Sequence, residues 1–207
     1  MLDLRRAAER LTAALGRQDW WPAETPFEMM LGAILVQNTR WHNVTLAMTR
    51  LREAGLLDPD PWAGATDETV LAAIHSCGFH RAKLRATRGL AEWMRAAGGA
   101  ELRHPVRPDP ELRSELLALP GVGEETADAI LLYAFDRPAF LYDAYARRMF
   151  GALTGAEPAS YAAARRTHAS DVAAAGFTLD ELQQLHALID EFGKLVADGA
   201  RSWAELR

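Results

Sequence analysis

The 207-residue sequence has only one cysteine and no excess of positive charge. A single cysteine, Cys77, cannot form an intramolecular disulfide, and one chain with one thiol cannot hold a four-thiolate iron–sulfur cluster or zinc site. The formal net charge is -5, from 23 basic and 28 acidic residues. A nucleic-acid partner therefore cannot be inferred from net charge and requires a local basic face.

Long apolar runs are missing as well. No stretch approaches the roughly 20 apolar residues of a membrane helix. Residues 1–10 resemble a charged helix start rather than a signal peptide. We therefore expect a cytoplasmic protein with no membrane partner. The six histidines show no metal-ligand spacing, so we expect neither a metal nor another cofactor.

The apolar residues follow a helical period almost everywhere, and no segment alternates as a strand does. Thr25-Pro26-Phe27-Glu28 reads as an N-cap, a proline at the first helical position and the acid of a capping box, which predicts a buried helix from about Pro26. Thr178 and Glu181 predict a second capped helix. The class is all-α, with further helices expected over 81–97, 141–153 and 161–175.

The most informative segment is Leu119-Pro120-Gly121-Val122-Gly123-Glu124-Glu125-Thr126-Ala127. A short helix is expected to end at 117 or 118 and a second to begin near Glu124, which describes a helix-hairpin-helix. Gly121, Val122 and Gly123 would bring the backbone close to a phosphate, whose oxygens accept N–H groups at the start of the second helix. The alternative is an ordinary helical hairpin in which the glycines only make the turn.

Other segments extend the pattern. Asp143 follows the second hairpin helix within Leu141-Tyr142-Asp143-Ala144-Tyr145-Ala146-Arg147-Arg148. Ile34-Leu35-Val36-Gln37-Asn38-Thr39 and Gly78-Phe79-His80-Arg81-Ala82-Lys83 lie upstream. With the hairpin, these segments resemble the helix-hairpin-helix DNA glycosylase superfamily, of which endonuclease III is a member, from about Trp20 to Lys194. The resemblance implies two helical lobes with a DNA-binding cleft between them: residues 24–135 with the hairpin, and residues 1–23 plus 136–207 with a catalytic aspartate.

Two departures narrow the resemblance. Bifunctional members carry a lysine nucleophile where this chain has Glu125, and a carboxylate cannot form a Schiff base with the sugar. Endonuclease III carries four cluster cysteines after a segment similar to Glu191-Phe192-Gly193-Lys194, whereas this chain continues with Leu195-Val196-Ala197-Asp198-Gly199. Both departures are shared by the 3-methyladenine glycosylase branch, so the resemblance implies neither strand cleavage at abasic sites nor an iron–sulfur cluster.

Asp143 is the expected catalytic residue. Hydrolysis of an N-glycosidic bond builds positive charge on the sugar, and a buried carboxylate can stabilise that charge and accept a proton from the attacking water. The structural alternative is that Asp143 only caps the following helix, a role that is compatible with catalysis.

The expected base pocket is aromatic. A flipped base needs ring faces, which Trp20, Trp21 and Trp41 could supply, with Pro22 as a rigid wall. An alkylated purine is cationic and gains about 0.5 to 2 kcal/mol per good contact with an electron-rich ring. Alternatively, Trp20 and Trp21 anchor the N-terminal helix in the core.

Further DNA contacts are expected from amides and basic side chains. Gln37 and Asn38 could fill the space left by the flipped base, or they could cap a helix C-terminus. Arg81 and Lys83 begin a basic run that would face phosphates, although a solvated helix face explains such runs equally well.

These residues predict a monofunctional glycosylase that excises cationic purines such as 3-methyladenine from double-stranded DNA in base excision repair, acting as a monomer. An endonuclease III-like glycosylase for another damaged base is the nearer alternative. A non-catalytic DNA-binding protein is the alternative from a different class. Asp143 argues against it, whereas Leu141-Tyr142 and Ala144 depart from the common Val-Asp-Thr pattern.

Overall fold

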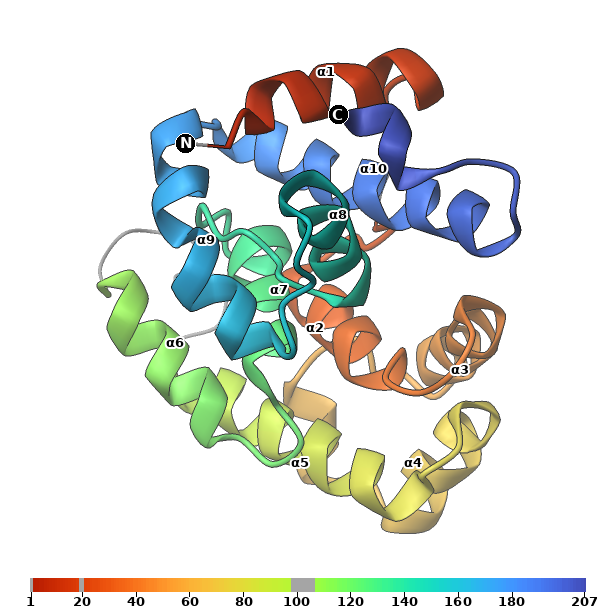
Figure 1. Ribbon diagram of the computed structural model, residues 1–207. Helices are drawn as coiled ribbons and strands as arrows, with labels where there is room; N and C mark the ends of the chain where they lie inside the picture. The colour runs from red at the N-terminus through yellow and green to blue at the C-terminus, as the bar shows by residue number, and fades with distance from the viewer. Residues whose placement is uncertain (1, 19–20, 98–106) are drawn as a thin grey trace. The chain divides into compact units, whose positions relative to one another are not determined.

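The computed structural model describes residues 2–18, 21–97 and 107–207, and within these ranges all regular structure is helical (Figure 1). This confirms the all-α class. No helix in the described part of the chain is long and apolar enough to span a membrane. The α-helices are α1 (Leu4–Leu15), α2 (Pro26–Leu35), α3 (Trp41–Glu53), α4 (Asp67–Ile74), α5 (His80–Ala96), α6 (Asp109–Ala118), α7 (Glu124–Ala134), α8 (Ala144–Thr154), α9 (Tyr161–Ala175) and α10 (Leu179–Ala197).

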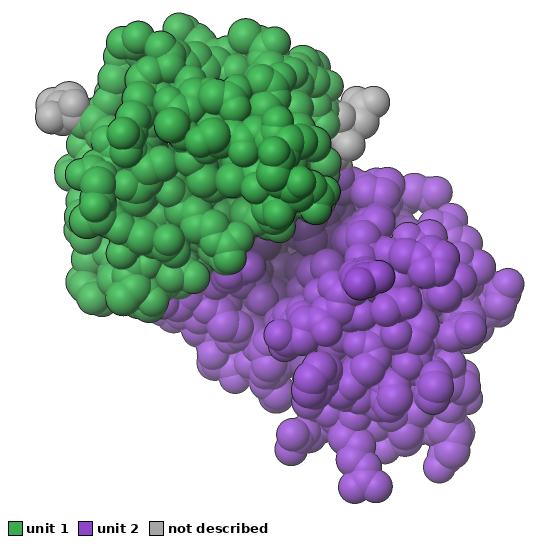
Figure 2. Space-filling model, turned by 45° about the vertical axis from the view of Figure 1, so that its right-hand side comes forward, with its two compact units in different colours: residues 1–20, 137–207 green, residues 21–136 purple. Residues whose placement is uncertain are grey.

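The chain divides into two compact units, which Figure 2 shows in different colours. Unit 1 combines Met1–Trp20 with Arg137–Arg207, and unit 2 is the continuous segment Trp21–Asp136. Each unit has its own set of buried apolar side chains.

Unit 2 is built around α2, which packs against α7 and α5. Thr25 caps this helix: its hydroxyl accepts the N–H of Glu28 at 3.1 Å. The Glu28 carboxylate accepts the N–H of Glu24 at 3.0 Å, one residue before the predicted capping-box partner. Nearly every residue of α2 is buried, so the helix forms the core on all its faces.

In unit 1, α10 packs against α1 and α8. The predicted capping box is present at its start, where Thr178 and Glu181 each accept the other's backbone N–H. Helix α8 begins at Ala144 rather than at the predicted 141. Leu141 and Tyr142 are buried but not helical, because the Asp143 side chain caps the helix only from the following residue onward.

Candidate functional site

The helix-hairpin-helix is formed as predicted by α6 and α7, which pack against each other. Gly121 has a φ of +75°, and a Cβ atom there would lie 3.0 Å from the Cβ of Ala86 in α5. Gly123 is the N-cap of α7, and a Cβ atom there would meet nothing within 4 Å. Both glycines are exposed, whereas Val122 is buried. The turn thus combines a conformation that needs glycine with an open backbone at the start of a helix.

Two side-chain contacts, neither of them predicted, fix this turn. Arg113 in α6 forms a bidentate ion pair with the buried Asp128 in α7, with N–O distances of 2.6 and 3.0 Å. Gln37 donates from its amide to the carbonyl of Gly121 at 3.0 Å and to the hydroxyl of Thr126 at 2.9 Å. We predicted that Gln37 fills the space left by a flipped base or caps a helix C-terminus. In the structure its side chain instead links the end of α2 to the hairpin. Asp128 is an acidic residue among the apolar residues of α7, and this was the one sequence signal for its ion pair with Arg113.

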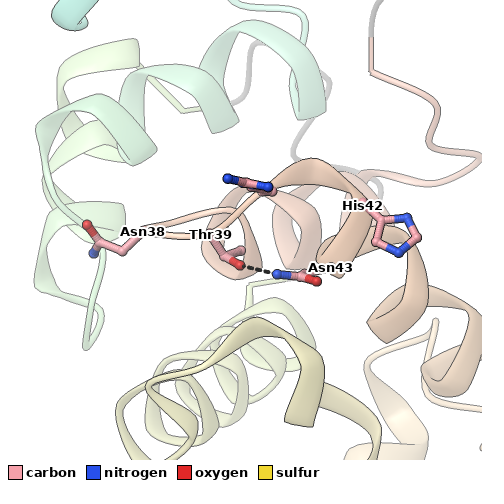
Figure 3. A pocket seen from close by; sticks show the side chains of 5 residues that line it. Asn38, Thr39, His42 and Asn43 are labelled. Carbon is pink, nitrogen blue, oxygen red and sulfur yellow. Dashed lines mark hydrogen bonds between the residues drawn. The ribbon is translucent and has the colours of Figure 1, made fainter.

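Asn38 and the residues after it, which connect α2 to the first turn of α3, line an open pocket (Figure 3). Asn38 has a left-handed backbone, with φ +55°, and an exposed side chain. Within the pocket the amide of Asn43 donates to the Thr39 hydroxyl at 2.9 Å. The pocket-lining residues are Asn38, Thr39, Arg40, His42 and Asn43. All five side chains carry hydrogen-bonding groups, and the segment that they belong to follows Gln37 directly in the chain.

An aromatic cluster forms in unit 2 around Trp21. Its ring stacks on Tyr133 of α7, with centroids 5.6 Å apart and planes at 26°, and meets Trp41 edge-on at 5.5 Å. A Cβ atom on Gly32 would lie 3.4 Å from the Trp21 indole nitrogen, so the indole packs against α2 at Gly32. Trp41 is 42% exposed. The cluster therefore has a packed part and a part open to solvent.

The other predicted pocket residues are placed differently. Pro22 is exposed, and Trp20 lies outside the described residues. Trp21 packs within unit 2, whereas α1 belongs to unit 1. Tyr133 was missed by sequence reasoning, although an aromatic residue among the aliphatic ones of α7 was a signal.

Lys83 is buried, at 4% exposure, and does not face solvent as predicted. Its ammonium donates to the carbonyls of Leu35, Gln37 and Cys77 at 2.8 to 2.9 Å, which uses all three of its N–H groups. Burial lowers the pKa of this ammonium. The reason is helical geometry: Arg81 and Lys83 are two residues apart, so they project from different faces of α5. Arg81 is exposed and stays a candidate phosphate contact, whereas Lys83 caps the end of α2.

Phe79 is the most exposed large apolar side chain among those described, at 67%. It precedes α5 in a left-handed conformation, with φ +49°, directly after Gly78 with φ +69°. A bulky residue in this conformation is uncommon and marks strain that the surrounding structure must sustain. The segment was noted in the sequence, but the outward direction of Phe79 was not predicted.

Asp143, in unit 1, caps α8: its Oδ1 accepts the N–H of Ala146 at 2.7 Å. The predicted structural role is thus confirmed. Its other oxygen, Oδ2, lies 3.5 Å from Nε2 of His186 in α10. The capping bond leaves Oδ2 for other chemistry.

Glu125 is exposed in the first turn of α7, next to Glu124. Negative charge at this end of a helix complements the helix dipole. The chain's one cysteine, Cys77, is buried, and burial raises the pKa of its thiol. The residues of this chain therefore do not fit a cluster that needs four thiolates.

Comparison with known proteins places this fold and these residues in a family. Residues 31–173 match the family model of the HhH-GPD superfamily base excision DNA repair proteins, and the chain belongs to that superfamily. A protein of Methanocaldococcus jannaschii, MJ1434, provisionally named a DNA repair glycosylase, is 40% identical over 140 residues, which are 67% of this chain and 64% of that protein. The chain thus spans just under two thirds of this relative's length.

The chain is also similar to an endonuclease III and to a 3-methyladenine DNA glycosylase. Endonuclease III of Sulfolobus acidocaldarius is 28% identical over 172 residues, or 81% of this chain and 72% of that protein. A crystal structure of H. pylori 3-methyladenine DNA glycosylase bound to 1,N6-ethenoadenine has a TM-score of 0.71 and 25% identity, covering 92% of this chain and 98% of that one.

Proposed function

We propose that this protein is a monofunctional DNA glycosylase that removes cationic, alkylated purines such as 3-methyladenine from double-stranded DNA, acting as a monomer. The observation that carries the proposal is the half-open aromatic cluster of Trp21, Trp41 and Tyr133. It lies in the same unit as the hairpin. The superfamily membership supports a base excision repair glycosylase, and the H. pylori neighbour supports the substrate class.

The cluster suits a flipped cationic base. Trp21 is fixed between Tyr133 and α2, whereas Trp41 presents an exposed ring beside it. A base that enters at Trp41 meets electron-rich faces, which attract a positive charge by about 0.5 to 2 kcal/mol per contact. A neutral base gains only the stacking. This difference favours the cationic lesions.

The hairpin suits the DNA backbone. A Cβ atom at Gly123 would meet nothing within 4 Å, and the first N–H groups of α7 have no partner within the helix, so they are available to a phosphate. Arg81 adds an exposed positive charge on α5. Such contacts position the duplex without reading its sequence.

Phe79 suits the gap that a flipped base leaves. An aromatic ring that projects into solvent is unfavourable in the free protein, but it stacks well between bases. The left-handed backbone of Phe79 directly precedes α5, and the ring is exposed from that position.

Asp143 supplies the chemistry. As the N-glycosidic bond breaks, its electron pair leaves with the base and positive charge develops on the sugar. Asp143 stabilises that charge and accepts a proton from the water whose oxygen bonds to C1′. An alkylated purine already carries a positive charge and departs readily, so this step needs little acid catalysis. Glu125 offers no amine, so the product is free base and an intact abasic strand.

Single-turnover excision tests the proposal. Wild type and Asp143→Asn are compared on duplexes carrying 3-methyladenine, 7-methylguanine, hypoxanthine, uracil or thymine glycol. We expect wild type to release the two methylated purines fastest and Asp143→Asn to release them slowly. Excision of thymine glycol or uracil instead would favour the endonuclease III-like alternative that the Sulfolobus relative supports. Binding without release of any base would favour the non-catalytic alternative.

A further inference from the structure

The two oxygens of Asp143 have different neighbours, which gives them different roles. Oδ1 accepts the Ala146 N–H at 2.7 Å and is held by that bond. Oδ2 lies 3.5 Å from Nε2 of His186. The side chains of Asp143 and His186 are 10% and 11% exposed, so the contact is largely shielded from solvent. Oδ2 is therefore the oxygen available to the reacting sugar or water, and His186 lies beside it.

His186 belongs to a charged row along α10. Asp190 follows one turn later and Lys194 one turn after that. The Lys194 ammonium lies 2.6 Å from Asp190 Oδ2 and 2.8 Å from Glu191 Oε1. Burial raises the pKa of Asp190, the hydrogen bond and charge of Lys194 lower it, and the nearby Asp143 carboxylate raises it. The groups of α10 and the carboxylate of α8 are thus close enough to act on one another.

The close approach of the two helices sets the distance from His186 to Asp143. Helices α8 and α10 pack against each other, and a Cβ atom on Gly193 would overlap the Tyr145 ring. Gly193 therefore lets Tyr145, two residues after Asp143, lie directly on α10. This contact holds the start of α8 at the face of α10 that carries His186.

We propose that His186 is a positioning residue for Asp143, an inference that rests on the proposed glycosylase function. With Oδ1 fixed by the capping bond, a hydrogen bond from the imidazole Nε2–H to Oδ2 holds the carboxylate plane in one orientation toward the sugar. The 3.5 Å separation is longer than the usual 2.7 to 3.2 Å of such a bond. Hydrogen bonds at catalytic sites often shorten when substrate binds. His186 acts through Asp143 and does not touch the substrate.

The first test separates rate from affinity. On the duplex from which wild type releases the methylated base fastest, we expect His186→Ala to lower the single-turnover rate about 10- to 100-fold, the scale of a misplaced catalytic group. Its affinity for undamaged duplex should stay within about twofold. His186→Gln places an amide nitrogen near the former Nε2 and should recover most of the rate. Gln184→Ala is the matched control, because Gln184 is on the same helix but bonds to the backbone of Gln18.

The second test asks whether His186 acts through Asp143. In the Asp143→Asn background, adding His186→Ala should cause no further loss, since the group that His186 positions is already disabled. An additive loss would overturn the inference. So would a wild-type rate in His186→Ala, or equal losses in His186→Ala, His186→Gln and Gln184→Ala that follow their melting temperatures. A wild-type protein that excises no base would instead refute the proposed function, and the inference with it.

Discussion

Units 1 and 2 present different kinds of chemistry. The candidate groups of unit 2 are mostly uncharged: the open backbone at Gly123, the aromatic cluster and the exposed ring of Phe79. Unit 1 contributes a carboxylate, Asp143, with an imidazole beside it. Under the proposed function, the groups that bind DNA and the base belong to unit 2, and the group that assists bond cleavage belongs to unit 1. In that proposal, a chain with net charge -5 binds DNA largely through uncharged groups. Substitutions in unit 2 should then change affinity or base selection, and those in unit 1 the rate.

The largest effect is expected at Asp143. Asp143→Asn should lower single-turnover excision by about 10² to 10³-fold, typical for the loss of a group that stabilises transition-state charge. Asparagine caps helices about as well as aspartate, so the melting temperature should barely change. Asp143→Ala should be as slow but also lose about 1 kcal/mol of stability through the missing cap. A large loss of DNA affinity in Asp143→Asn would contradict the assignment of binding to unit 2 and of catalysis to unit 1.

Lys83 and Arg81 test the two faces of α5. Lys83→Met leaves three buried carbonyls without their donor, so we expect a loss of about 2 to 4 kcal/mol in the free energy of unfolding, measured by urea denaturation. Arg81→Ala should leave stability within about 0.5 kcal/mol and weaken DNA binding with a reduced salt dependence. A stable Lys83→Met protein with weakened DNA binding would restore the phosphate contact first predicted for Lys83.

The sequence predicted the fold well because its signals are local. Helical periodicity, the Thr178–Glu181 capping box and the two glycines of the hairpin each act within a few residues, and the structure contains all three. The site was harder, since its members meet across long stretches of chain. Trp21 stacks on Tyr133, and Asp143 faces His186, and neither pairing leaves a pattern in neighbouring residues.

The prediction that Lys83 contacts phosphates was wrong for a second reason. A basic residue within a basic run is indistinguishable in sequence from its solvated neighbours. The three carbonyls that hold its ammonium come from the ends of α2 and of the segment before α5, which only the folded chain brings together.

The tryptophans separate base recognition from packing. Trp41→Ala should change stability little, because its ring is partly exposed, and should lower excision of 7-methylguanine by about 2- to 30-fold, which corresponds to one cation–π contact. Trp21→Ala removes the ring stacked on Tyr133 and should cost up to about 3 kcal/mol of stability as well. Excision of the neutral base hypoxanthine is the control for charge. An equal loss on both lesions in Trp41→Ala would show that charge recognition lies elsewhere.

A smaller effect is expected from the hairpin glycines, which form a matched pair. Gly123→Ala should fold normally, since its Cβ meets nothing within 4 Å, and should weaken binding about fivefold on damaged and undamaged duplexes alike, equivalent to about one hydrogen bond. Gly121→Ala should also lose about 1 to 2 kcal/mol of stability, because its φ of +75° disfavours a side chain and its Cβ would press on Ala86. Fluorescence anisotropy and thermal melting measure the two quantities. A loss of affinity confined to damaged DNA would contradict a phosphate-binding hairpin.

The smallest effect is expected from Glu125→Lys. Wild type should not cleave the strand at all, and this variant should gain at most a weak reaction with the sugar. Cleavage by a glycosylase requires an amine that attacks C1′, forms an imine and eliminates the 3′ phosphate. Glu125 supplies a carboxylate in the first turn of α7, and the ammonium of Lys83 is buried among backbone carbonyls of unit 2. Wild type should therefore leave an abasic strand intact, and borohydride should trap no covalent adduct with DNA. Glu125→Lys tests this position directly. Its amine would react only if it reaches the sugar and is neutral, and partial desolvation favours the neutral form. Weak trapping by this variant alone would place residue 125 near the sugar, whereas efficient trapping by wild type would refute the monofunctional mechanism and require another amine.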